Sequence, residues 1–331
     1  MVKGFYCPTV RSTGMKKVLA LISASIFSFQ LMSVAATPEQ PTVQRFAQWC
    51  QQKNTAPIET KKTIDALLRI ARTNNCNLAD TKLNNLSELR LRGSKIVDLG
   101  PLSSLSNLAH LDLNDNQIAD LKPLVSLANL KFLFLDNNRI WDLRPLSSLV
   151  NLEMLTLDRN QISNLQPLTS LSKLERLQLD NNKIADLKPL ANSFSLLDIS
   201  LDGNQVEDLQ PLANLNNLMA LSLTDNKVVN LSPLAKLSSL VKLNVDRNKV
   251  IDLQPLANLN RLELLYLNKN QIEDLKPLAS LSSLSRLFLN DNQIIDLKPL
   301  ANLSNLHSIE LQNNKISDKN CPTKMQQSCR F

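Results

Sequence analysis

Residues 108–129 read LAHLDLNDNQIADLKPLVSLAN, and residues 130–151 read LKFLFLDNNRIWDLRPLSSLVN. Both segments carry leucine or isoleucine at positions 1, 4, 6, 11, 14, 17 and 20, and both carry asparagine at position 9. A pattern that recurs after 22 residues indicates a repeat protein, in which short units stack on one another. One unit cannot bury seven apolar side chains by itself, whereas a stack of units buries them all.

The same register continues without insertion over residues 86–318 and gives eleven repeats with the consensus LxxLxLxxNxIxDLxPLxxLxx. Within each repeat, the residues occupy positions 1 to 22. Their first residues are Leu86, Leu108, Leu130, Leu152, Leu174, Leu196, Leu218, Leu240, Leu262, Leu284 and Leu306.

Each repeat predicts a short strand followed by a helical turn. The LxLxx segment alternates along a strand, so positions 4 and 6 point inward and positions 3, 5 and 7 point outward. Asparagine at position 9 can both donate to and accept from backbone groups where the coil turns, so we interpret it as scaffold. Aspartate at position 13 can accept from an amide two residues later, and proline at position 16 favours the first turn of a 3₁₀ or single α-turn. In one repeat Ser193 replaces the leucine of position 20, and we expect the Phe194 side chain to fill the space that this leucine would occupy in the core.

The repeats resemble leucine-rich repeats, in the 22-residue form of the bacterial internalins, through the signature LxxLxLxxN over residues 78–320. This resemblance implies an α/β fold, a right-handed leucine-rich-repeat solenoid shaped as a curved arc. Parallel β-strands would line its concave face, and short 3₁₀ or α turns its convex face. The flanks FAQWC…NNC and NCPTKMQQSCRF resemble the cysteine-containing caps of exported leucine-rich-repeat proteins from cyanobacteria.

The two ends of such a stack must be closed, because the outermost units expose the core. We expect residues 37–85 to form a helical N-terminal cap and residues 319–331 to form a C-terminal cap. In the first cap, residues 42–53 place Val43, Phe46 and Cys50 on one helical face, and residues 59–73 form a second amphipathic helix.

Residues 1–36 have the features of an export signal, with Lys16 and Lys17 before an apolar run that ends at small residues, so that cleavage after Ala36 is expected. Met15 begins a more typical signal than Met1 and is an alternative start. A membrane anchor is the other interpretation, but the run is short for a stable span. We therefore expect an exported chain in the periplasm, cell envelope or extracellular space, with no stable membrane span after signal removal.

Four cysteines flank the repeats as two pairs, and in an exported chain such pairs favour disulfides over metal ligands. The predicted bonds are Cys50–Cys76 and Cys321–Cys329, with free thiols as the alternative.

Charge and motifs exclude several classes of function. The net charge is +7, but the chain after residue 36 contains 33 basic and 30 acidic residues. This small excess of positive charge does not indicate a nucleic-acid partner. The sequence has no glycine-rich phosphate loop, HExxH or GxSxG motif. It therefore predicts no enzyme, no catalytic residue, no cofactor and no metal site.

The outward positions of the strands hold the candidate site, because the concave face is the usual binding surface of such arcs. Two apolar clusters flank a polar centre there, and aromatic side chains in a concave surface are typical interface anchors. An acidic stripe at position 7 is expected to set charge preference. One alternative is that the strands merely tolerate the aromatics or pack them on each other. The other is that the stripe is a solvated face with opposite charges beside it. The candidate residues are Phe132, Phe134, Met154, Leu264, Tyr266, Phe288, Asp136, Asp158 and Asp180.

These features favour an exported, monomeric protein that binds a protein, peptide or glycan on its concave face. One alternative is a structural cell-envelope component that self-associates through the arc. Another is an intracellular regulatory scaffold, like the similar repeats of phosphatase-regulatory proteins, although the signal and the cysteine pairs count against it.

Overall fold

The computed structural model describes residues 43–321 and 329–331. The export signal expected in residues 1–36 lies outside the described residues, as do residues 37–42 of the N-terminal cap and residues 322–328 of the C-terminal cap. No helix in the described part of the chain is long and apolar enough to cross a membrane.

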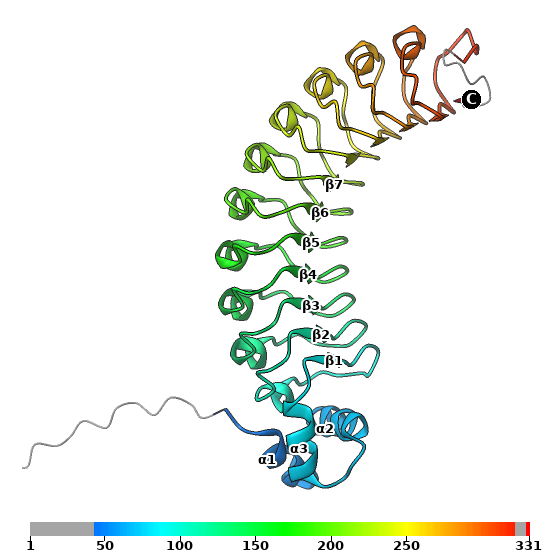
Figure 1. The fold of residues 1–331 in the computed structure, drawn as a ribbon. Coiled ribbons are helices and arrows are strands. Elements are labelled where there is room, and N and C mark those ends of the chain that lie inside the picture. The colour runs from blue at the N-terminus through cyan, green and yellow to red at the C-terminus, as the bar shows by residue number, and fades with distance from the viewer. Residues whose placement is uncertain (1–42, 322–328) are drawn as a thin grey trace, which may run out of the picture. The chain divides into compact units, whose positions relative to one another are not determined.

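The repeats build a single parallel sheet of twelve strands in sequence order. Neighbouring strands pair with a shift of one repeat, so Leu133 lies opposite Leu111 on one side and Leu155 on the other. Within the unit Val43–Phe331, the strands line the inner side of the curve and the 3₁₀ turns its outer side (Figure 1). The strands are β1 Glu88–Arg90, β2 His110–Asp112, β3 Phe132–Phe134, β4 Met154–Thr156, β5 Arg176–Gln178, β6 Asp198–Ser200, β7 Ala220–Ser222, β8 Lys242–Asn244, β9 Leu264–Tyr266, β10 Arg286–Phe288, β11 Ser308–Glu310 and β12 Cys329–Arg330.

A 3₁₀ turn follows each strand from β1 to β10, as the aspartate and proline positions predicted. In the repeat of β2, Asp120 Oδ1 accepts a 2.9 Å hydrogen bond from the backbone N–H of Lys122, and Pro123 lies in the first turn of the helix. The turns are η2 Gly100–Leu102, η3 Lys122–Ser126, η4 Arg144–Ser148, η5 Gln166–Ser170, η6 Lys188–Leu190, η7 Gln210–Leu212, η8 Ser232–Leu234, η9 Gln254–Leu256, η10 Lys276–Leu278 and η11 Lys298–Leu300.

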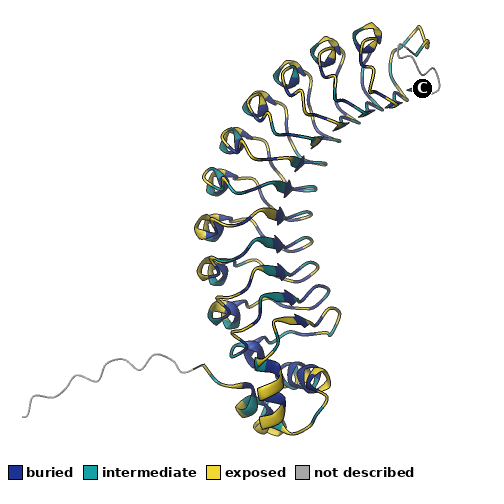
Figure 2. Ribbon diagram, viewed as in Figure 1, coloured by how far each residue is buried: buried dark blue, intermediate teal, exposed yellow. Residues whose placement is uncertain are grey.

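The core lies between the strands and the turns, and it is made of the seven apolar positions of each repeat. In the repeat of β3, Leu133, Leu135 and Ile140 have no exposed surface. The buried residues follow the solenoid from one repeat to the next (Figure 2). The solenoid predicted from the repeat is therefore confirmed.

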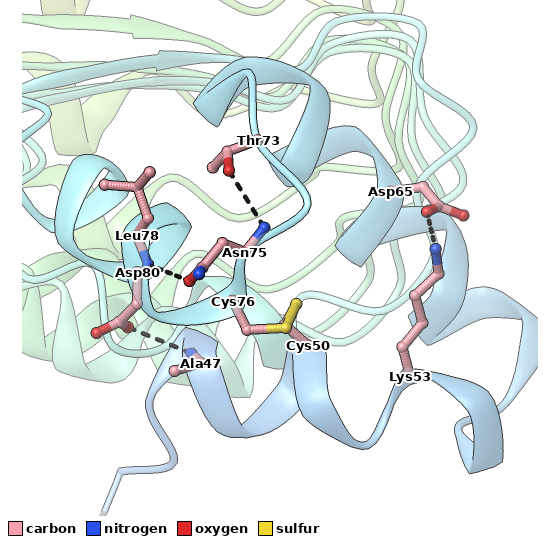
Figure 3. The surroundings of a disulfide bond; sticks show 9 residues. All are labelled: Ala47, Cys50, Lys53, Asp65, Thr73, Asn75, Cys76, Leu78 and Asp80. Atoms are coloured by element: carbon pink, nitrogen blue, oxygen red, sulfur yellow. Dashed lines mark hydrogen bonds and ion pairs between the residues drawn. A yellow bond between two sulfur atoms is a disulfide. The ribbon is translucent and has the colours of Figure 1, made fainter.

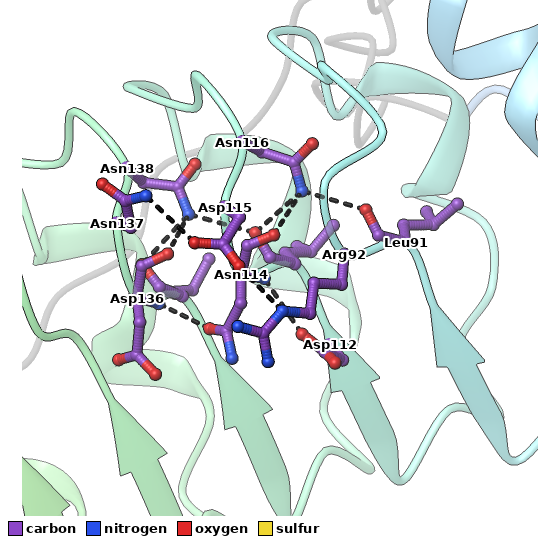
Figure 4. Close-up of polar contacts among 11 residues, drawn as sticks. Leu91, Arg92, Asp112, Asn114, Asp115, Asn116, Asp136, Asn137 and Asn138 are labelled. Carbon is purple, nitrogen blue, oxygen red and sulfur yellow. Dashed lines mark hydrogen bonds and ion pairs between the residues drawn. The ribbon is translucent and has the colours of Figure 1, made fainter.

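The asparagine at position 9 binds backbone groups of two repeats. Asn116 Nδ2 donates to the carbonyls of Leu91 and Leu113 at 3.0 and 2.9 Å (Figure 4). Its Oδ1 accepts from the backbone N–H of Ile96 at 2.9 Å. Equivalent bonds recur down the stack as far as Asn314. The scaffold role predicted for this column is confirmed.

The N-terminal cap contains three helices, whereas the sequence predicted two. They are α1 Phe46–Gln51, α2 Ile58–Ala71 and α3 Cys76–Asn84, with a short 3₁₀ turn, η1 Lys53–Thr55, after the first. The first helix is shorter than expected, and Val43 lies before it with 49% of its surface exposed, so its placement on the buried face was wrong. Helix α3 was missed, although Asn75 caps its N-terminus by accepting from the N–H of Leu78 at 3.0 Å.

A disulfide between Cys50 and Cys76 joins α1 to the start of α3, as predicted (Figure 3). Asp80 supports the same contact, because its carboxylate pairs with Arg45 and accepts from the N–H of Ala47. These bonds hold α1 and α3 together at the end of the repeat stack.

The C-terminal cap adds a strand that the sequence did not predict. The expected Cys321–Cys329 disulfide is formed, and Cys329 opens β12, which pairs in parallel with β11. The N–H of Leu311 donates to the carbonyl of Arg330 at 2.7 Å. The last repeat is therefore covered by a short strand as well as by the disulfide.

The expectation for Phe194 was wrong. Its side chain is 54% exposed and does not replace the missing leucine. The backbone keeps the usual register, because the N–H of Leu196 donates to the carbonyl of Ser193 as Leu218 does to Leu215 one repeat later. Phe194, at position 21, therefore points outward from the solenoid.

Candidate binding face on the concave sheet

Each three-residue strand presents its middle residue to the core and its two flanking residues to the concave face. In β3, Leu133 is fully buried, whereas Phe132 and Phe134 are half-buried on the other face. The parallel register aligns the outward residues in two rows, one at repeat position 3 and one at position 5. In these rows, Phe132 lies beside Met154 and Phe134 lies beside Thr156.

The first cluster consists of Phe132, Phe134 and Met154, and the register of β3 and β4 brings these residues together as predicted. His110 on β2 completes it, with its ring centroid 6.0 Å from that of Phe132 and 5.0 Å from that of Phe134. His110 also lies 3.9 Å from the Glu88 carboxylate on β1. Sequence reasoning did not include His110, although it occupies position 3 one repeat before Phe132.

The second cluster consists of Leu264, Tyr266 and Phe288 on β9 and β10, and the structure also brings these residues together. The Tyr266 and Phe288 rings stack with centroids 4.5 Å apart and planes within 2° of parallel. Lys242 Nζ lies 6.0 Å from the Tyr266 centroid, within the range of a cation–π contact. The sequence did not single out Lys242, because a lysine at position 3 does not reveal that its side chain lies near an aromatic ring of the next strand.

The acidic residues at position 7 have a structural role that the sequence did not reveal. Asp136 Oδ1 accepts from the N–H of Asp158 at 2.9 Å, and Asp158 Oδ1 accepts from the N–H of Asp180 at 2.7 Å. We call this column of side-chain to backbone bonds the position-7 ladder. Asn114 and Asn268 make the same bond to the following repeat, so the ladder itself does not require a charge.

Burial raises the pKa of the predicted stripe residues Asp136, Asp158 and Asp180, because the half-buried carboxylates lose hydration. Hydroxyl groups from the next strand oppose this shift at two of them. Ser200 Oγ donates to Asp180 Oδ1 at 2.6 Å, and the Thr156 hydroxyl lowers the pKa of Asp136.

Asp158 differs because Gln178 occupies the place of that hydroxyl. Burial first, and then the charges of Asp180 and Asp136, raise the pKa of Asp158 to about 7. The middle of the stripe therefore changes charge near neutral pH.

The repeats match a family model for leucine-rich repeats over residues 84–126, 106–148, 128–170, 150–192 and 260–302. The chain is a leucine-rich-repeat protein. No curated protein sequence matches it.

Solved structures with the same fold include two internalins of Listeria monocytogenes. Internalin InlF is 28% identical, with 78% of this chain and 90% of that chain covered and a TM-score of 0.56. The functional domain of InlJ is 20% identical, with 83% and 63% covered and a TM-score of 0.64, which shows a shared fold. The internalin-like character of the repeats is confirmed.

A plant receptor is also similar in structure. The leucine-rich-repeat ectodomain of the Arabidopsis thaliana receptor kinase GASSHO1/SCHENGEN3, solved in complex with CASPARIAN STRIP INTEGRITY FACTOR 2, is 25% identical with a TM-score of 0.59. The match covers 70% of this chain and 33% of the receptor chain.

Proposed function

We propose that this leucine-rich-repeat protein is exported and binds a protein or peptide on its concave face, through the first and second clusters. The observation that carries the proposal is the placement of aromatic rings in outward rows that the scaffold leaves free. Leu133 and its equivalents repeat down the stack because the core needs them, whereas Phe134 has Asp112 and Thr156 as its row neighbours. Half-buried aromatics of this kind are typical anchors of an interface.

The disulfides support export, because such bonds persist in oxidising compartments such as the periplasm, the cell envelope or the extracellular space. Cys50–Cys76 and Cys321–Cys329 each lie in a cap, where they stabilise the ends of the stack. The receptor ectodomain similar to this chain was itself solved in a complex, which supports a binding role for this arc.

A peptide or protein fits the second cluster better than a glycan does. A sugar ring packs against an open aromatic face, but Tyr266 has Phe288 stacked on its ring and Lys242 within cation–π distance. The pair therefore forms an apolar wall, against which an aliphatic or aromatic side chain of a partner can pack.

A crosslinking pull-down from the native envelope or medium tests the proposal. The test variant carries Phe132→Ser and Phe134→Ser on β3. The matched control carries Trp141→Ser and Phe194→Ser, which remove two exposed aromatics outside the concave strands. We expect the test variant to lose a partner that the wild type and the control both retain. Equal loss with both variants, or with neither, would contradict a site on the concave face.

A further inference from the structure

The two clusters lie on one continuous sheet, in the same two outward rows, so a single ligand can contact both. From β3 to β9 there are six steps between neighbouring strands. At about 4.8 Å per step, this places the clusters roughly 29 Å apart across the strands.

The surface between the clusters is a floor of small and polar side chains. Row 5 contains Gln178, Ser200 and Ser222 there, and row 3 contains Ala220. The two serine hydroxyls already donate to Asp180 and Asp202, at 2.6 and 2.7 Å, so they lie against the sheet. The aromatic rings of the two clusters lie at the two ends of this floor, and the extended backbone of a ligand can lie across the floor between them.

The floor is also mainly acidic. Six aspartates line it, against the two row-3 cations Arg176 and Lys242 and the arginines Arg159 and Arg247 beside the ladder. This charge complements basic side chains in a ligand and disfavours acidic ones. The six are Asp136, Asp158, Asp180, Asp202 and Asp246 of the position-7 ladder and Asp198 of row 3.

We propose that the ligand is an extended basic peptide segment that runs across the strands, with one apolar side chain at each cluster. An extended chain advances about 3.3 Å per residue, so the two apolar residues would be roughly nine residues apart. This inference rests on the proposed function, because it assumes that the concave face binds a partner, and it adds the chemistry and the length of the bound segment.

Synthetic peptides of lysine, serine and glycine test the spacing with the full chain by fluorescence anisotropy. Each peptide has two phenylalanines that are roughly five, nine or thirteen residues apart. We expect the middle spacing to bind roughly tenfold or more tighter than a peptide with one phenylalanine changed to serine, because the second anchor binds at high effective concentration. Glutamate in place of lysine should abolish the binding.

The Phe132→Ser and Phe134→Ser variant and a Tyr266→Ser and Phe288→Ser variant should each reduce the two-anchor peptide to the affinity of the one-anchor peptide. No binding, equal binding at all three spacings, or loss with only one of the two variants would overturn the inference.

The pull-down separates this inference from the proposed function. Loss of the partner with the first-cluster variant alone supports binding on the concave face and overturns the two-anchor ligand. Loss with each variant supports both, whereas loss with neither removes the proposed function itself.

Discussion

The Oδ1 atom of Asp158 accepts a 2.7 Å hydrogen bond from the backbone N–H of Asp180, one repeat further along the stack. The same carboxyl group therefore supports the scaffold and contributes to the acidity of the candidate site. Asparagine performs the scaffold part of this role at other levels of the ladder. The charge and the structural bond can thus be separated by one substitution, Asp158→Asn.

The first prediction concerns the pH dependence of stability. The pKa of Asp158 is raised to about 7, so the folded chain keeps a proton that the unfolded chain releases. Its contribution to stability is greatest below about pH 4 and falls as the pH rises to about 7. Asp158→Asn removes this titration and keeps the acceptor, so we expect a higher melting temperature than the wild type above neutral pH and little difference in acid.

Asp142→Asn is the control with the opposite sign. Hydrogen bonds from the Arg144 side chain and backbone lower the pKa of Asp142, so its contribution is present above the ordinary aspartate pKa and is lost in acid. We expect this variant to be slightly less stable than the wild type at neutral pH. If both substitutions shifted the melting temperature in the same direction at every pH, the electrostatic explanation would be wrong.

The second prediction concerns the position-9 column. Asn160 donates to the carbonyls of Leu135 and Leu157 and accepts from the N–H of Ile140, all in the buried interior. Asn160→Ala leaves these groups unpaired, so we expect the free energy of unfolding to fall by about 3 kcal/mol.

The exposed neighbour Gln161 provides the matched control, and Gln161→Ala should stay within about 0.5 kcal/mol of the wild type. Denaturant unfolding measures both variants. Equal losses for the two substitutions would show that the column is not essential to the scaffold.

The column and the core could be predicted because each of their positions recurs in every repeat with one chemistry. The contacts of residues that do not recur from repeat to repeat could not be predicted from the sequence. His110 and Lys242 join the clusters through ring distances to the next strand, which spacing alone does not reveal. Helix α3 and strand β12 lie in the caps, where no repetition marks them. The position-7 ladder was missed because its aspartates were interpreted only as surface charges.

The third prediction compares the two disulfides. Cys50 and Cys76 are 26 residues apart in sequence, and Cys321 and Cys329 are 8 apart. A bond that closes a longer loop restricts the unfolded chain more, by about 3.5 against about 2.5 kcal/mol on the chain-entropy model. We expect the Cys50→Ser and Cys76→Ser variant to lose more stability in denaturant unfolding than the Cys321→Ser and Cys329→Ser variant. The reverse order would contradict this explanation.

The fourth prediction separates core from face within β3. Leu133→Ala removes a fully buried side chain and should destabilise the chain by about 3 kcal/mol. The change of Phe132 and Phe134 to serine should have a smaller effect, because both rings are only half-buried. Thermal unfolding measures the difference. A larger loss from the phenylalanine pair would mean that these rings serve mainly the fold.

Hydroxyl-radical footprinting, with and without the partner captured in the pull-down, tests the concave binding face most directly. Aromatic side chains react readily, and the chain offers reporters on and off the face. We expect Phe132, Phe134, Tyr266 and Phe288 to be protected in the complex, while the exposed Trp141 and Phe194 react as before. Protection of Trp141 and Phe194, with the four concave aromatics unchanged, would contradict the proposed site.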